Sequence, residues 1–175
     1  MVEKKIKNSI VRLIKGDVTD LDIEAFVFYA RSDLELGSGY GTAISVRGGP
    51  EVKKELKAVG SLDMGEAAVT SAGNMKAKYI VHAVGPKFQE VDTEAKLRKT
   101  MKSALDAAES KGITRIAFPP MGSGFYGVPP DICAEIMVSE VKTYLENNTK
   151  IREVVFCPLH TRDFNPLKAR LEVLG

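Results

Sequence analysis

Tryptophan is absent from the 175 residues, and cysteine and histidine occur only twice each. Cys133 and Cys157 are too few and too isolated for a disulfide framework. We therefore expect two buried thiols that pack as small apolar side chains. The sequence predicts no metal site and no cofactor.

Long hydrophobic runs are also missing. No apolar stretch approaches the ~20 residues that a membrane-spanning helix needs. The segment Met1–Lys7 is polar and lacks the apolar core of a secretion signal. We expect a cytoplasmic protein without a membrane partner.

Charge of one sign does not dominate the chain. Lys and Arg number 25 and Asp and Glu number 23, which leaves a formal net charge of +2. The two signs are interspersed along the sequence, so no basic field indicates general nucleic-acid binding. Duplex DNA is therefore not an expected partner.

The pattern of apolar residues predicts one α/β domain over residues 1–175, with no repeat or linker to divide it. Short runs rich in Val, Ile, Phe and Tyr predict buried strands. These runs are Ile10–Ile14, Ala25–Ala30, Ala67–Ser71, Tyr79–Val84, Arg115–Phe118 and Glu153–Cys157.

Apolar residues at helical spacing predict two longer helices between these strands. The first set is Leu97, Met101, Leu105 and Ala108, and the second is Ile132, Ile136, Val141 and Tyr144. Strands that alternate with helices of this length predict a three-layer α/β/α sandwich, with a mixed, mostly parallel sheet of about six strands.

Two glycine-rich loops follow predicted strands and lead toward helical segments. They are Gly37-Ser38-Gly39-Tyr40-Gly41 and Gly122-Ser123-Gly124-Phe125-Tyr126-Gly127. Glycine allows the backbone to turn its N–H groups toward an anion, and parallel sheets bind ligands at the carboxyl ends of their strands. The two loops together predict a diphosphate that is held from both sides.

Other nucleotide and catalytic motifs do not fit these loops. Neither loop contains the lysine of a nucleoside triphosphatase loop, and the two-and-two spacing of Gly37, Gly39 and Gly41 departs from Gly-x-Gly-x-x-Gly. Ser123 has glycine on both sides, so the nucleophile elbow Gly-x-Ser-x-Gly is absent. A triphosphatase, a nicotinamide dehydrogenase and a serine hydrolase are all disfavoured.

Three polar residues near strands admit a functional or a structural interpretation. Asp17 is able to accept a hydrogen bond from an amine such as N6 of adenine, or to close a turn with its own backbone, and its spacing favours the turn. His82 lies between aliphatic residues of a strand, which indicates a core histidine. His160 has no carboxylate close in sequence to orient it.

Four segments resemble the macro domain family in order and spacing. They are GDVTDLDIEAFVFYA at 16–30, GSGYGTAI at 37–44, GEAAVTSAGNMKAKYIVHAVGP at 65–86 and IAFPPMGSGFYG at 116–127. The resemblance covers nearly the whole chain. It implies an α/β/α module that binds ADP-ribose and related metabolites.

The resemblance also implies a role for each matching residue. Asp17 would bind the adenine amino group, and Val18 would add a backbone contact at the same end. The diphosphate would lie between the two loops, and the adenine-stacking position of the family matches Leu159, with Phe164 close by. The loop residues so assigned are Gly37, Ser38, Gly39 and Tyr40, and Gly122, Ser123, Gly124, Phe125 and Tyr126.

Two departures from the family pattern bear on catalysis. Arg31 stands where hydrolytic members carry an Asn that orients the distal ribose, and Gly41 stands where they carry a water-activating Asp. We therefore predict no catalytic residue and expect a reader or metabolite sensor. Arg31 is predicted to bind a terminal phosphate of the ligand, to fill the pocket itself, or to point to solvent and pair with Asp33 or Glu35.

The alternatives belong to other functional classes. One is an ADP-ribosyl hydrolase or O-acetyl-ADP-ribose deacetylase that uses non-standard catalytic residues. Another is a binder of poly(ADP-ribose) or RNA ends, whose affinity would fall steeply with salt. An ADP-ribosylated protein is a further partner that the resemblance allows.

Overall fold

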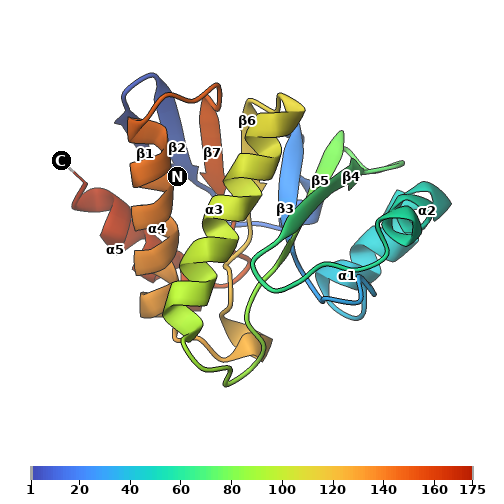
Figure 1. Ribbon diagram of the computed structural model, residues 1–175. Helices are drawn as coiled ribbons and strands as arrows, with labels where there is room; N and C mark the ends of the chain where they lie inside the picture. Colours follow the sequence, from blue (N-terminus) through green and yellow to red (C-terminus); the bar gives the residue numbers. More distant parts are fainter. Residues whose placement is uncertain (1, 175) are drawn as a thin grey trace.

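A seven-stranded sheet forms the middle layer of the computed structural model, which describes residues 2–174 (Figure 1). Its order is β1-β2-β7-β6-β3-β5-β4. The strands are β1 (Val2–Ile6), β2 (Ser9–Leu13), β3 (Ala25–Ala30), β4 (Ala67–Ser71), β5 (Tyr79–Val84), β6 (Arg115–Phe118) and β7 (Glu153–Phe156). The pairs β1–β2 and β4–β5 are antiparallel, and the remaining neighbours are parallel.

Helices cover both faces of the sheet. The longer ones are α2 (Pro50–Val59), α3 (Thr93–Lys111), α4 (Pro130–Glu146) and α5 (Thr161–Glu172). Shorter helical turns are η1 (Val18–Asp20), α1 (Tyr40–Ala43), the π-helical turn η2 (Ile44–Gly48) and η3 (Gly124–Tyr126). The predicted α/β/α architecture with a mixed, mostly parallel sheet is confirmed.

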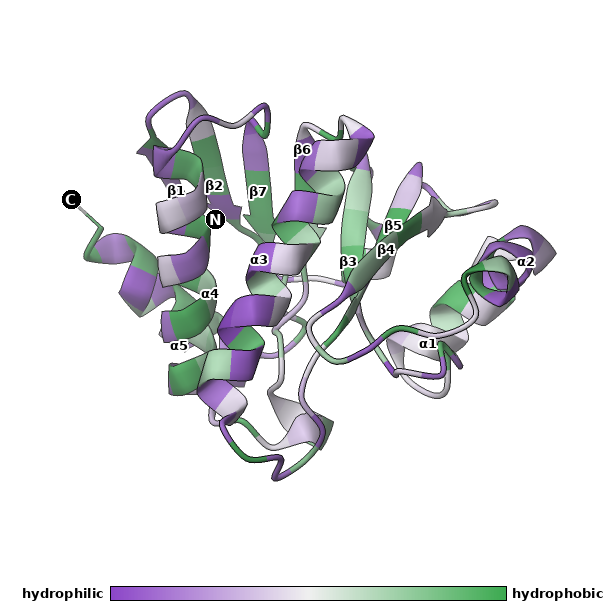
Figure 2. Cartoon of the chain, in the orientation of Figure 1, coloured by the Kyte–Doolittle hydropathy of each residue, from purple (hydrophilic) through white to green (hydrophobic). Residues whose placement is uncertain are grey.

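The core consists of two apolar clusters, one on each face of the sheet. Helices α3, α4 and α5 contribute Leu97, Met137 and Leu171 to one cluster. The region from η1 to α2 contributes Val18 and Leu56 to the other. In Figure 2 the central strands are mostly green, whereas the outward turns of α3 carry purple segments. This amphipathic pattern explains why α3 was predictable from its apolar spacing.

Strand β1 and helix α5 were not predicted. Strand β1 is an edge strand in which Glu3 and Lys5 are exposed while Ile6 is buried, so its apolar signal is diluted by charged residues. Helix α5 contains Pro166 and buries only a narrow stripe through Leu167 and Leu171, which weakens its helical pattern. The sheet therefore has one strand more than the predicted six.

His82 and the two cysteines lie in the core, as expected. His82 of β5 is 1% exposed, and its Nε2 lies 2.9 Å from Oγ1 of Thr70 on β4. Burial lowers the pKa of His82 to about 4 and raises the pKa of the Cys133 and Cys157 thiols to about 12. At neutral pH the imidazole is uncharged and both thiols are protonated.

The parallel strands bring their loops to one edge of the sheet. Strands β2, β7, β6, β3 and β5 are consecutive neighbours that run in the same direction, so their carboxyl ends meet there. The loop after β3 leads to the first glycine-rich loop, and the loop after β6 contains the second. The topology thus places both loops beside one another.

Candidate functional site

Three adjoining cavities form a continuous trough at this edge. The central cavity, of about 340 Å³, is lined by both glycine-rich loops. The Asp17 cavity, of about 400 Å³, shares Gly39 and Ser123 with the central one. The Arg31 cavity, of about 570 Å³, shares Phe125 and Tyr126 with it. The trough is therefore elongated, with the glycine-rich loops at its middle.

The two glycine-rich loops present main-chain amides that the protein does not use. Gly39 and Gly124 have φ angles of +62° and +71°, which other residues rarely adopt. Within residues 2–174, no acceptor receives a hydrogen bond from the amides at 38–40 and 123–125. Unpaired main-chain donors on both sides of one cavity suit a ligand with several anionic oxygens.

Asp17 closes a turn and also lines the Asp17 cavity. Its Oδ1 accepts hydrogen bonds from the Thr19 amide, at 2.9 Å, and from the Thr19 hydroxyl, at 2.6 Å. Its Oδ2 lies 3.5 Å from Nη2 of Arg47. The turn interpretation therefore holds for one oxygen, while the second oxygen keeps a lone pair available to a ligand.

Apolar surface in the Asp17 cavity comes from Leu159 and Tyr40. Leu159 follows β7 and is 46% exposed. Phe164 is not part of this surface, because it packs against the core cluster that contains α5. Burial, followed by the nearby Asp17 carboxylate, raises the pKa of Tyr40 to about 12, so its hydroxyl stays protonated at neutral pH.

Arg31 lies at the junction of the central and Arg31 cavities and pairs with Asp33. Its Nη2 is 2.6 Å from Oδ2 of Asp33. The Glu35 amide donates a hydrogen bond to Oδ1 of Asp33, and this bond together with Arg31 lowers the pKa of the Asp33 carboxyl. The predicted pairing of Arg31 with Asp33 is thus present, and the guanidinium still faces the trough.

Aromatic residues form the wall of the trough near Arg31. The Tyr29 ring stacks on the Tyr126 ring, and the Phe125 ring meets Tyr126 edge-on, with centroids 5.3 Å apart. Phe125 is 85% exposed. In this wall, Tyr29 and Tyr126 pack against each other, while Phe125 presents an exposed apolar ring.

Comparison with known proteins identifies the family. The sequence matches the macro domain family over residues 29–137, which is more than half of the chain. The chain belongs to the macro domain family. It is 38% identical over 154 residues to a macro domain-containing protein of Listeria monocytogenes, covering 83% of this chain and 88% of that protein. An uncharacterized protein of Sulfurisphaera tokodaii is 41% identical over 150 residues, covering 83% of this chain and 82% of that protein.

Solved macro domains share the fold of this macro domain. The Oceanobacillus iheyensis macrodomain with ADP superposes with a TM-score of 0.91 at 25% identity, covering 98% of this chain and 94% of that chain. The Trypanosoma brucei macrodomain in complex with ADP-ribose superposes with a TM-score of 0.85 at 27% identity, covering 91% of this chain and 68% of that chain.

Gly41 leaves no room for a side chain in this macro domain. A Cβ built on Gly41 would lie 1.6 Å from the Leu36 carbonyl oxygen. A carboxylate at this position would require the first loop to move. The close packing of residues 36–41 therefore requires glycine at position 41. Introducing an Asp there would change the shape of the loop as well as the side chain.

Most predicted site residues line the trough, and two do not. The side chain of Val18 is buried in the core, and Gly124 lies within the second loop but outside the lining residues. The sequence interpretation missed Arg162 and Asp163 and assigned no role to His160, and all three line the Asp17 cavity. The only sequence signal for them is a polar segment directly after the last strand.

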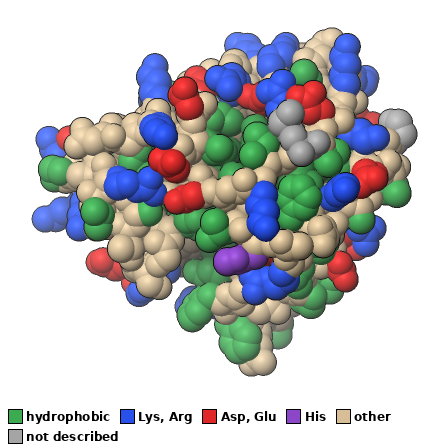
Figure 3. Space-filling model, turned by 180° about the vertical axis from the view of Figure 1, so that it is seen from behind, with side chains coloured by type: hydrophobic (Ala, Val, Ile, Leu, Met, Phe, Trp, Pro, Cys, Tyr) green, Lys and Arg blue, Asp and Glu red, His purple; other side chains and the backbone are tan. Residues whose placement is uncertain are grey.

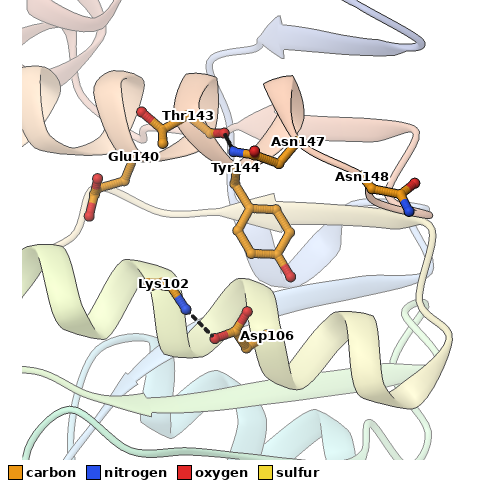
Figure 4. Close-up of a pocket in the computed structure, with 7 residues that line it drawn as sticks. All are labelled: Lys102, Asp106, Glu140, Thr143, Tyr144, Asn147 and Asn148. Carbon is orange, nitrogen blue, oxygen red and sulfur yellow. Dashed lines mark hydrogen bonds and ion pairs between the residues drawn. The ribbon is translucent and has the colours of Figure 1, made fainter.

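A separate pocket of about 340 Å³ lies between α3 and α4 (Figure 4). Lys102 pairs with Asp106 at 2.9 Å, and Nδ2 of Asn147 donates to the Thr143 carbonyl oxygen at 2.7 Å. Burial raises the pKa of Tyr144, and the Asp106 carboxylate raises it further. Four of its residues pair with one another and it shares no residue with the trough, so this pocket is not the candidate site.

The remaining surface shows no field of one charge on the face seen in Figure 3, where basic and acidic side chains lie among one another. None of the helices within residues 2–174 combines the length and hydrophobicity that crossing a membrane requires.

Proposed function

We propose that this macro domain binds ADP-ribose or a close derivative in the trough and acts as a reader or metabolite sensor. The observation that carries the proposal is the set of unpaired main-chain amides on both sides of the central cavity. Each charge-assisted bond from an amide to phosphate contributes about 1.5 to 3 kcal/mol. Four or five such bonds suffice to anchor a diphosphate.

The shape of the trough supports one orientation of the ligand. Adenine would occupy the Asp17 cavity, where Oδ2 of Asp17 accepts from N6 and Leu159 covers the base. The diphosphate would occupy the central cavity, and the distal ribose would lie against Tyr126 near Arg31. Macro domains of similar structure from Oceanobacillus iheyensis and Trypanosoma brucei were solved with ADP and ADP-ribose, which supports this class of ligand.

The residues at positions 33 and 41, near the distal end of the trough, favour binding over hydrolysis. Position 41 carries no side chain, and Asp33 is already paired with Arg31. The lowered pKa of Asp33 makes it a weak general base at neutral pH. Loss of general-base help typically reduces the rate by about 10² to 10⁴. An ADP-ribosylated protein would then be held rather than cleaved.

Calorimetry and turnover assays on the same preparation test this function. We expect ADP-ribose to bind more tightly than ADP, and ADP more tightly than adenosine. We also expect no release of acetate from O-acetyl-ADP-ribose, or of ADP-ribose from a modified protein, above the background rate. Failure to bind ADP-ribose contradicts the proposal, and steady turnover of either substrate identifies an enzyme instead.

A further inference from the structure

Arg162 of α5 lies in the Asp17 cavity, close to the second glycine-rich loop. It lies in the first turn of α5 and lines the Asp17 cavity together with Gly39 and Ser123, one residue from each loop. Its Nη2 is 3.7 Å from the position that a Cβ on Gly124 would occupy. One end of the guanidinium therefore lies close to the second glycine-rich loop.

Asp163 holds this guanidinium in place. The Asp163 side chain is 5% exposed, whereas that of Arg162 is 56% exposed. Nη2 of Arg162 donates to Oδ2 of Asp163 at 3.2 Å. Oδ1 of Asp163 has no hydrogen-bond partner among residues 2–174. A buried carboxylate beside a half-exposed guanidinium orients the cation and leaves its outer edge open.

The remaining donors of Arg162 are available to a ligand. A guanidinium has five N–H donors in a planar fork that matches phosphate oxygens, and within residues 2–174 Arg162 commits one of them, to Asp163. Arg31, the other arginine that lines the trough, lies at its opposite end, at the junction of the central and Arg31 cavities. Because Gly39 and Ser123, which line the Asp17 cavity together with Arg162, also line the central cavity, Arg162 is placed to meet a phosphate at the boundary between the two cavities.

We propose that Arg162 is a phosphate-binding residue that contacts the phosphate group next to the adenosine, with Asp163 as its positioning residue. This inference rests on the proposed function. It adds a side-chain cation to a site in which the glycine-rich loops otherwise supply main-chain donors. Selectivity for phosphorylated adenosine over adenosine then depends on α5 as well as on the loops.

The test compares ADP-ribose, ADP and adenosine binding to wild-type protein and variants by calorimetry. Arg162→Gln removes the charge while its amide is still able to donate to Asp163, so the buried carboxylate keeps a partner. Arg170→Gln is the matched control, because Arg170 lies two turns further along α5 and faces Glu135 at 3.8 Å, away from the trough. Asp163→Asn tests the positioning role.

Arg162→Gln should weaken ADP-ribose and ADP by about tenfold, the effect of one charge-assisted hydrogen bond, and leave adenosine within about twofold. Its affinity for ADP should also depend less on salt than that of the wild type, because an exposed charge has been removed. Asp163→Asn should produce a smaller loss confined to the phosphorylated ligands, and Arg170→Gln should change nothing. A purely structural role for Arg162 would instead lower the affinity for all three ligands equally.

The outcomes separate the two proposals. If the wild type does not bind ADP-ribose, the proposed function fails and this inference fails with it. If the wild type binds but Arg162→Gln retains its affinity for ADP and ADP-ribose within about twofold, only the assignment of Arg162 is overturned. Equal losses for adenosine and ADP overturn it as well.

Discussion

The rings of Tyr29 and Tyr126 stack with their centroids 4.1 Å apart and their planes inclined by 25°. Tyr29 belongs to β3, and its hydroxyl donates a hydrogen bond to the Pro86 carbonyl oxygen. Tyr126 belongs to the second glycine-rich loop. The stack therefore fixes the second glycine-rich loop against the central strand β3. Through the Tyr29 hydroxyl, β3 is in turn connected to the segment after β5.

Tyr126→Ala should weaken ADP-ribose binding by about tenfold, because it removes both a wall of the trough and an aromatic contact of about 0.5 to 1.5 kcal/mol. Tyr29→Phe is the matched control. It keeps the stack and leaves the Pro86 carbonyl without its donor, so it should reduce the free energy of unfolding by about 1 to 3 kcal/mol with little change in binding. Calorimetry and urea denaturation distinguish the two. Equal affinities of Tyr126→Ala and wild type would show that the wall does not contact the ligand.

Gly41→Ala should destabilise the protein by about 1 to 3 kcal/mol and weaken ADP-ribose binding, because the new Cβ forces the first loop away from Leu36. Gly16→Ala is the control, since a Cβ there meets its nearest atom, Sγ of Cys157, at 3.8 Å. The control should remain within about 0.5 kcal/mol of wild type in denaturant unfolding. If both variants unfold at the same denaturant concentration, the packing argument for Gly41 is wrong.

Asp17→Asn should reverse part of the preference for adenine. The Asn side-chain oxygen is able to keep the hydrogen bonds to Thr19, while its amide nitrogen presents a donor where Oδ2 presents an acceptor. We expect ADP to bind about tenfold more weakly and inosine diphosphate, which has an oxygen in place of N6, to gain relative to ADP. Calorimetric titration of both nucleotides measures the ratio. An unchanged ratio would remove Asp17 from base recognition.

His82 should make the protein sensitive to acid. Its pKa is about 4 in the folded state, below the ordinary 6.5, so the unfolded state takes up a proton first as the pH falls. The stability associated with neutral His82 is complete above pH 6.5 and is lost toward pH 4, by about 3 kcal/mol.

The His82→Gln variant isolates this effect, because glutamine is able to keep the hydrogen bond to Thr70 without titrating. The gap in unfolding free energy between wild type and variant should shrink by about 3 kcal/mol between pH 7 and pH 4. Denaturant unfolding across this range measures the gap. A gap that stays constant with pH would mean that His82 does not account for the acid sensitivity.

The parts of the site that were predictable depend on short-range signals. Strands such as Tyr79–Val84 are read from local composition, and a glycine-rich loop directly after a strand lies at a sheet edge whatever the rest of the chain does. Asp17 follows the same logic, because it comes soon after β2. The position of these residues in the site could be predicted from the order of strands and loops alone.

Other parts depend on contacts between distant segments. Arg162 meets the second loop only because α5 packs beside α4. The closeness of the Gly41 α-carbon to the Leu36 carbonyl is a property of the folded loop that no residue type reveals. Strand β1 alternates charged and apolar residues, and this pattern indicates a strand only once its pairing with β2 at the edge of the sheet is known.

The most direct test of the account is an amide NMR titration of the labelled protein with ADP-ribose. Hydrogen bonds from main-chain N–H groups to the diphosphate should move the corresponding amide proton signals downfield, and adenosine, which lacks the diphosphate, should move them less. The amides concerned are those of Ser38, Gly39, Tyr40, Ser123, Gly124 and Phe125. Saturating binding that leaves the signals of both loops unmoved would contradict the claim that these two loops hold the diphosphate.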